Sequence, residues 1–118
     1  MNNSPKKVIP VSIIVPSLAS PVEIIPLLSA LHESTVWPKQ IIIVDVRSNI
    51  LQESNISDSI SRNFLSLLTI IHTDRTLFPG EARNKAFSYI ECDLIAFLDL
   101  YTLPHCSWLE SSYDLIKE

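Results

Sequence analysis

Residues 41–44 read IIIV, four β-branched residues in a row, and Asp45 follows them directly. Residues 11–15 (VSIIV), 67–71 (LLTII) and 94–98 (LIAFL) are similar short apolar runs. Continuous runs of this length and composition are typical of strands that are buried on both faces. We therefore predict four buried strands at these positions.

Helical patterns separate the four runs. Residues 21–34 carry apolar residues at helical spacing, with Ser20 as the candidate N-cap and Pro21 in the first turn. Pro26 lies six residues into this segment, so we expect it to kink the helix or to shift its start. Residues 47–58 are polar and form a predicted loop. The remaining helices are predicted near residues 57–65, 79–91 and 104–117.

The alternation of strands and helices predicts the fold class. Buried strands that alternate with helices form mostly parallel sheets with helices on both faces, here a Rossmann-like three-layer α/β/α sandwich. We expect one domain over residues 11–118, preceded by a flexible tail over residues 1–10 in which Lys6 and Lys7 are solvated. Ligands of such sheets bind at the carboxyl ends of the strands, where the strand order reverses.

Composition and charge exclude several classes of protein. Charged residues make up 19% of the chain and the net charge is −4 without a basic stripe, so nucleic acid is not an expected partner. No apolar run approaches the ~18 residues of a membrane span, and the start lacks the apolar core of a signal peptide. We read Cys92 and Cys106 as free thiols and expect a cytoplasmic protein, dissolved or peripherally bound to a membrane.

The low proportion of charged residues carries a further expectation about assembly. A surface with so little charge predicts that some apolar area is normally covered. We therefore expect self-association, most simply as a two-fold dimer.

Glycine is nearly absent, with Gly80 as the single example. The dinucleotide fingerprint and the phosphate-binding P-loop both need several glycines, so both are excluded. The chain also lacks the G-x-S-x-G nucleophile elbow of the α/β-hydrolases, and its three histidines have no shared ligand spacing. A bound nucleotide is therefore expected to be held by side chains and by a metal.

Side chains at the predicted strand ends are the candidates for chemistry. Asp45 can accept hydrogen bonds from a base or a ribose, or it can cap local backbone amides. Arg83, beside Asn84, can pair with a carboxylate or a phosphate, or it can lie free on the surface. Asp99 follows the last strand, where its carboxylate can bind a divalent cation, although one carboxylate alone makes a weak site.

Four stretches in this order resemble the family 2 glycosyltransferases of the GT-A fold. They are VSIIVP (11–16), IIVDVRS (42–48), PGEARNKA (79–86) and IAFLDLY (95–101), the last followed by Pro104 and by WLE at 108–110. They are similar to the family patterns VSIIVP, IVVDDGS, PGxARNxG and IxFLDxD. The resemblance covers about residues 8–112 and implies the N-terminal, donor-binding half of a GT-A fold.

The resemblance implies a ligand and a set of site residues. The ligand would be a nucleoside diphosphate sugar, from which an inverting enzyme transfers the sugar to an acceptor hydroxyl, as in hexosyl transfer during polysaccharide biosynthesis. Asp45 would contact the base, and Pro16 and Ser17 would line the nucleotide pocket. Arg83 and Asn84 would border the same crevice. Asp99, as the first aspartate of the DxD motif, would help to hold Mg²⁺ or Mn²⁺ on the diphosphate.

The sequence also departs from the family pattern. Val46 and Arg47 replace the second aspartate and the glycine of DDGS, and Tyr101 replaces the second aspartate of DxD. The general base and the acceptor-binding segments of the family are expected beyond residue 118, so we expect no catalytic residue within these residues. The alternative interpretation is a non-catalytic GT-A-like interaction or assembly module. A flavodoxin-like receiver needs paired acids after its first strand, which this chain does not have.

Overall fold

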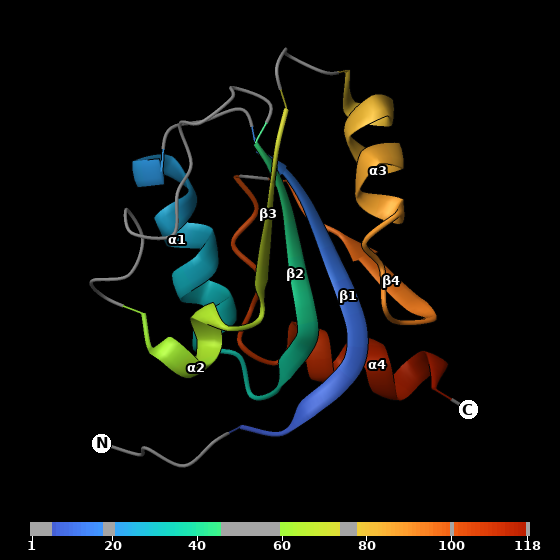
Figure 1. Cartoon of the computed structure of the whole chain (residues 1–118). Helices are drawn as coiled ribbons and strands as arrows, with labels where there is room; N and C mark the ends of the chain where they lie inside the picture. The colour runs from blue at the N-terminus through green and yellow to red at the C-terminus, as the bar shows by residue number, and fades with distance from the viewer. Residues whose placement is uncertain (1–5, 18–20, 46–59, 74–77, 100, 118) are drawn as a thin grey trace.

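Four parallel strands form one sheet at the centre of the molecule (Figure 1). The computed structural model describes residues 6–17, 21–45, 60–73, 78–99 and 101–117. The strands are β1 (Val8–Ser17), β2 (Trp37–Asp45), β3 (Leu68–His72) and β4 (Leu94–Phe97), in the order β3-β2-β1-β4. The predicted parallel sheet is therefore confirmed.

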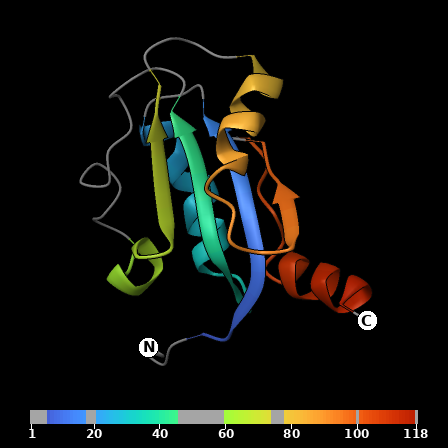
Figure 2. The same ribbon diagram turned by 45° about the vertical axis from the view of Figure 1, so that its right-hand side comes forward.

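Four helices cover the two faces of this sheet. They are α1 (Pro21–His32), α2 (Arg62–Leu65), α3 (Pro79–Phe87) and α4 (Trp108–Ile116). Figure 2 shows α3 in front of one face of the sheet and α1 behind the other. Residues of α2 and α4 join the hydrophobic cluster on the α1 side. The three layers predicted from the sequence are thus confirmed.

The core has two parts because the strands bury side chains on both faces. On the α1 side, the strand residues Ile13 and Ile43 and the helix residue Leu28 are fully buried. On the α3 side, Ile14 and Ile42 pack against small alanines of the helix. Full burial of one such aliphatic side chain stabilises the fold by about 1.5–3 kcal/mol, so these apolar runs make a large favourable contribution to folding.

The first strand begins earlier than predicted, because residues 8–10 are strand and not tail. The pairing of β1 with β2 runs from Ile9 opposite Pro38 to Ser12 opposite Gln40, so β1 contains one extra residue there. A bulge of this kind accommodates prolines, which cannot donate to a regular ladder. Pro10 and Pro38 therefore lie within strands, outside the runs 11–15 and 41–44 that were predicted from the sequence.

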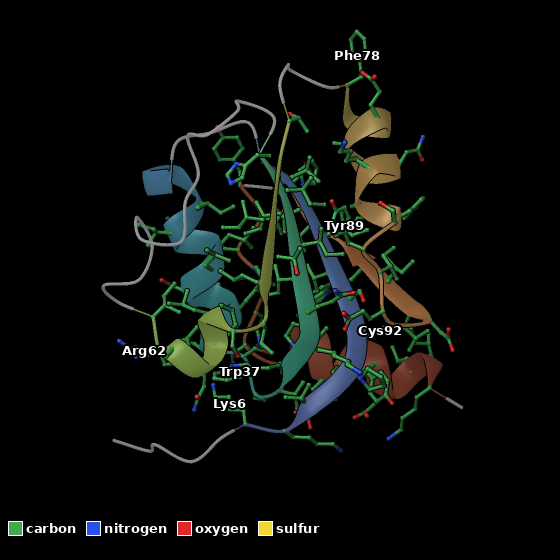
Figure 3. The ribbon with its side chains drawn as sticks, viewed as in Figure 1. Lys6, Trp37, Arg62, Phe78, Tyr89 and Cys92 are labelled. Atoms are coloured by element: carbon green, nitrogen blue, oxygen red, sulfur yellow. The ribbon has the colours of Figure 1, made fainter. Side chains whose placement is uncertain are left out.

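The predicted solvation of Lys6 is wrong. Its Nζ donates to the carbonyl oxygens of His32 at 3.0 Å and Ser34 at 2.6 Å, where α1 ends. The nearby Trp37 N–H donates to the Lys7 carbonyl oxygen at 2.9 Å. Figure 3 shows Lys6 and Trp37 together at the amino ends of the strands, with Phe78 at the opposite end of the molecule.

The loop after α1 is joined to the segment before α4 at this same amino end. The Thr35 N–H donates to the Cys106 carbonyl oxygen at 2.9 Å, and the Thr35 hydroxyl donates to Glu110 Oε1 at 2.7 Å. The Ser34 hydroxyl also donates to the Cys106 carbonyl oxygen, at 3.2 Å. Long-range hydrogen bonds therefore close the amino end of the sheet.

Helix boundaries differ from the sequence prediction in several places. Helix α1 starts at Pro21 as predicted and continues past Pro26, which is exposed, but it ends two residues early. Its expected cap, Ser20, lies outside the described residues. Helix α2 is confined to four residues, α3 ends at Phe87, and α4 begins at Trp108 instead of residue 104. Among the described helices, none has the length and hydropathy needed to cross a membrane.

Candidate functional site

The strand order reverses between β1 and β4. Strand β1 lies between β2 and β4, so the chain moves from one side of β1 to the other after β3. In parallel α/β sheets, the crevice at such a reversal, beyond the carboxyl ends of the strands, is where ligands bind. This topology locates the candidate site before any side chain is considered.

The backbone register brings the predicted site residues to this one edge. Ser17 on β1 lies opposite Asp45 on β2. On the other side, Ile14 lies opposite Phe97, and the Leu98 N–H donates to the Ile14 carbonyl oxygen at 3.0 Å, so Asp99 follows at the carboxyl end of β4. Because adjacent strands are about 4.8 Å apart, the backbones at Asp45 and Asp99 are separated by roughly 10 Å across β1.

Pro16 is half-buried between these positions, on the strand that both neighbours share. For Ser17 and Asp45, the structure describes the backbone only. Leu18, Val46 and Arg47, which the sequence places beside them, lie outside the described residues. The structure thus brings Pro16, Ser17, Asp45 and Asp99 to a common edge.

Asp99 is exposed and comes directly after the buried Leu98. Its backbone carbonyl accepts a hydrogen bond from the Thr102 N–H at 3.1 Å, so the chain turns immediately after the strand. Tyr101, in this turn, is 76% exposed. Within the described ranges, no three His, Cys, Asp or Glu side chains gather into a metal-binding group. The protein therefore offers a single described carboxylate at this end of β4.

Helix α3 begins beside this edge, and a side chain from its first turn caps its amino end. The Phe78 N–H donates to Glu81 Oε1 at 3.0 Å. Glu81 therefore has a structural role, in which its charge also favours the positive end of the helix dipole. Asn84 is exposed one turn further along the helix.

Arg83 lies on the exposed side of α3 and reaches β4. Its guanidinium carbon is 5.2 Å from the ring centroid of Phe97, two residues before Asp99. The structure thereby brings Arg83 to the strand that Asp99 follows. Phe97 was not among the predicted site residues, because the run 94–98 has the composition of a fully buried strand, whereas this position is 45% exposed.

A buried polar network that was not predicted lies further toward the amino ends of β1 and β2. Ser12, fully buried on β1, donates to Gln40 Oε1 at 2.6 Å. Gln40 in turn accepts from the Glu91 N–H at 2.7 Å and donates to the Tyr89 carbonyl oxygen at 3.1 Å. These bonds attach the turn after α3 to the two central strands. A lone glutamine before an apolar run carries no sequence signal for such a role.

The model of the glycosyl transferase family 2 matches residues 12–118. The chain belongs to this family. The match includes three of the four stretches on which the sequence resemblance depended and the first from its second residue on, so the predicted family is confirmed.

Solved glycosyltransferase structures share the fold. S. aureus TarS matches with a TM-score of 0.75 and 25% identity, over 92% of this chain and 20% of that chain. TarS 1-349 in complex with UDP gives the same TM-score and identity, over 92% of this chain and 32% of that one. The mannosyltransferase PcManGT from Pyrobaculum calidifontis, in complex with GDP-Man and Mn²⁺, matches with a TM-score of 0.59 and 20% identity, over 83% of this chain and 31% of that one.

These matches show what share of the larger structures this chain resembles. The chain spans about a fifth to a third of the length of the structures that it resembles. It corresponds to a portion of the GT-A fold, as the resemblance predicted. No curated protein sequence matches this family 2 chain.

Proposed function

We propose that this family 2 domain binds a nucleoside diphosphate sugar at the carboxyl ends of β1, β2 and β4. The observation that carries the proposal is the reversal of strand order between β1 and β4, which brings Pro16 and Asp99 to one edge beside α3. The similarity to TarS, solved in complex with UDP, supports a nucleotide as the ligand.

Each part of the ligand has a proposed partner. Asp45, at the end of β2, accepts hydrogen bonds from the base or the ribose, while Pro16 and Ser17 line the pocket from β1. Arg83 pairs with the diphosphate, since its planar guanidinium is always charged and matches two phosphate oxygens at once. Asn84 donates its side-chain amide beside it.

A divalent ion fits this site only together with the diphosphate. Asp99 supplies one carboxylate, and the phenol of Tyr101 is a poor ligand for a hard cation at neutral pH. Mg²⁺ is commonly bound by one or two carboxylates plus substrate phosphates, which is the arrangement that Asp99 allows. The ion, Mg²⁺ or Mn²⁺, would offset negative charge on the departing diphosphate. The structure of PcManGT with GDP-Man and Mn²⁺ supports the choice of ion.

The reaction that this donor site serves is an inverting transfer. The acceptor hydroxyl oxygen forms a bond to the anomeric carbon while the bond from that carbon to the diphosphate oxygen breaks, and the hydroxyl proton passes to a carboxylate base. The residues named above bind and orient the donor, and none of them is proposed as that base. Hexosyl transfer in polysaccharide biosynthesis, in the cytoplasm, is the setting that we propose.

Calorimetric titration with UDP-, GDP- and dTDP-sugars, with and without Mn²⁺, tests the proposal. We expect one base to be preferred, Mn²⁺ to tighten binding, and Asp99→Asn to remove this gain. Asp45→Asn should weaken binding in the absence of metal as well. Asp114→Asn is the matched control, because Asp114 is an exposed aspartate on α4 whose described ion pair is with Lys117 at 3.3 Å. Absence of binding to all three donors, or equal losses in the control, would contradict the proposal.

A second candidate function is a non-catalytic module of the same fold. Tyr101 in place of a second acidic residue favours it, since this removes one of the two expected metal ligands. On this view, Asp99→Asn leaves the biological role unchanged even though it abolishes metal-assisted nucleotide binding. Complementation of a deletion strain by the Asp99→Asn variant separates the two functions.

A further inference from the structure

Among the described contacts, the one that Arg83 makes is with an aromatic ring. Its guanidinium carbon lies 5.2 Å from the centroid of Phe97, and within the described part of the chain it has no ion pair. A guanidinium at this distance is attracted electrostatically to the face of the ring. The contact limits where the long and otherwise exposed arginine side chain can lie.

The ring of Phe97 is itself fixed from two sides. Its backbone pairs with Ile14 in the sheet, and the next residue donates to the Ile14 carbonyl oxygen. Phe87 meets the same ring edge to face, with centroids 6.3 Å apart and an interplanar angle of 64°. Arg83 and Phe87 are four residues apart and therefore share one side of α3. Two side chains of α3, Arg83 and Phe87, thus contact the ring of Phe97 on β4.

Burial in the core does not explain why a large aromatic side chain occupies position 97. The residue is 45% exposed, and its neighbour on the same face of β4, Ile95, is 39% exposed. Among the described contacts the guanidinium makes no hydrogen bond, so its N–H groups that do not face the ring remain available to a ligand. Those groups are the ones that form paired hydrogen bonds with a phosphate.

We propose that Phe97 is a positioning residue that presents Arg83 to the diphosphate of the donor. The ligand in this inference rests on the proposed function, whereas the stacking contact does not. Phe97 is the last residue of β4, and Asp99 follows it two residues later. The contact with Phe97 therefore fixes the Arg83 cation relative to the chain segment that carries the Asp99 carboxylate. An aliphatic residue at position 97 would keep the strand but free the arginine.

The first test measures the contact without any nucleotide. In the wild-type protein, we expect the NMR signals of the Arg83 side chain to be shifted upfield by the ring current of Phe97. Phe97→Leu should return them to ordinary values, while Phe97→Trp should keep the upfield shift. Ile95→Ala is the control at the adjacent exposed position and should leave the signals unchanged. Unshifted Arg83 signals in the wild-type protein would overturn the inference.

The second test measures donor affinity by titration with the preferred nucleoside diphosphate sugar. We expect Phe97→Leu to weaken binding by about two- to fivefold, which is the fold-change that corresponds to an exposed cation–π contact. Phe97→Trp should bind as the wild type does, and Phe97→Leu should add nothing to Arg83→Ala. Additive losses in the double variant would contradict a role through Arg83. A wild type that binds no donor refutes the proposed function, while the NMR result still decides the stacking contact.

Discussion

Replacement of Gln40 by leucine should show how strongly the stability of the sheet depends on one buried side-chain amide. The Gln40 side chain is 5% exposed and makes three described hydrogen bonds, to Ser12, Tyr89 and Glu91. Leucine has a similar size but can neither donate nor accept. The substitution therefore removes the hydrogen bonds while it largely keeps the packing.

The three lost partners do not cost the same. The Ser12 hydroxyl is completely buried, so leaving it without a partner costs about 1–3 kcal/mol. Tyr89 and Glu91 lie in an exposed turn, where their backbone groups can form hydrogen bonds with water instead. Each lost bond therefore costs about 1 kcal/mol. We expect Gln40→Leu to lower the free energy of unfolding by about 4 kcal/mol, a large part of the 5–15 kcal/mol typical of a domain.

Urea unfolding followed by the fluorescence of the buried Trp37 measures this change. In a Gln40→Leu background, Ser12→Ala should raise the free energy of unfolding by about 1 kcal/mol or more, because it removes a buried hydroxyl that has lost its hydrogen-bond partner. In the wild-type background the same substitution should lower it. Lys39→Leu, at the exposed neighbouring position, is the control and should change stability by less than about 0.5 kcal/mol. If Ser12→Ala destabilises both backgrounds equally, the network does not act as described.

Three further perturbations follow from the fold. Phe64→Ala, at a fully buried position of α2, should cost about 3–5 kcal/mol in chemical unfolding; a loss below 1 kcal/mol would mean that α2 is not part of the core. Lys6→Met should cost about 1–3 kcal/mol through the two lost carbonyl contacts, whereas Lys7→Met should have no measurable effect. In the described part of the sheet, β4 is an edge strand with exposed apolar residues. Sedimentation equilibrium should therefore show self-association that increases with protein concentration and is weaker in the Ile95→Lys variant. A monomer at all concentrations would refute this.

The sequence predicts the strands well where side chains are apolar on both faces. The run at residues 41–44 could be assigned without tertiary information, since no other element buries four β-branched residues in a row as readily. The amino end of β2 could not, because Trp37 and Pro38 resemble a loop until the bulge in β1 is known. Prolines at positions 10 and 38 are tolerated through a tertiary adjustment that local sequence does not encode.

Helix ends depended on distant partners in the same way. The segment after Phe87 has a helical pattern, yet the Tyr89 carbonyl and the Glu91 N–H are bonded to Gln40, which ends α3 early. The candidate site was predictable as a set of strand ends, since Asp45 and Asp99 each follow an apolar run. The contact between Arg83 and Phe97 was not, because it depends on how α3 lies across the sheet.

Thr35, Ser34 and Lys6 close the amino end of the sheet. Stability of the scaffold and selection of the donor therefore depend on different parts of one small domain. The residues that secure the scaffold lie at one pole, and those proposed to select the donor lie at the other. Changes at the donor pole can therefore accumulate without loss of the fold, which is the condition under which a lineage can acquire new sugar specificities. Libraries that vary residues 16, 17, 84 and 99 should accordingly yield mostly folded proteins, whereas libraries at residues 34 and 35 should not.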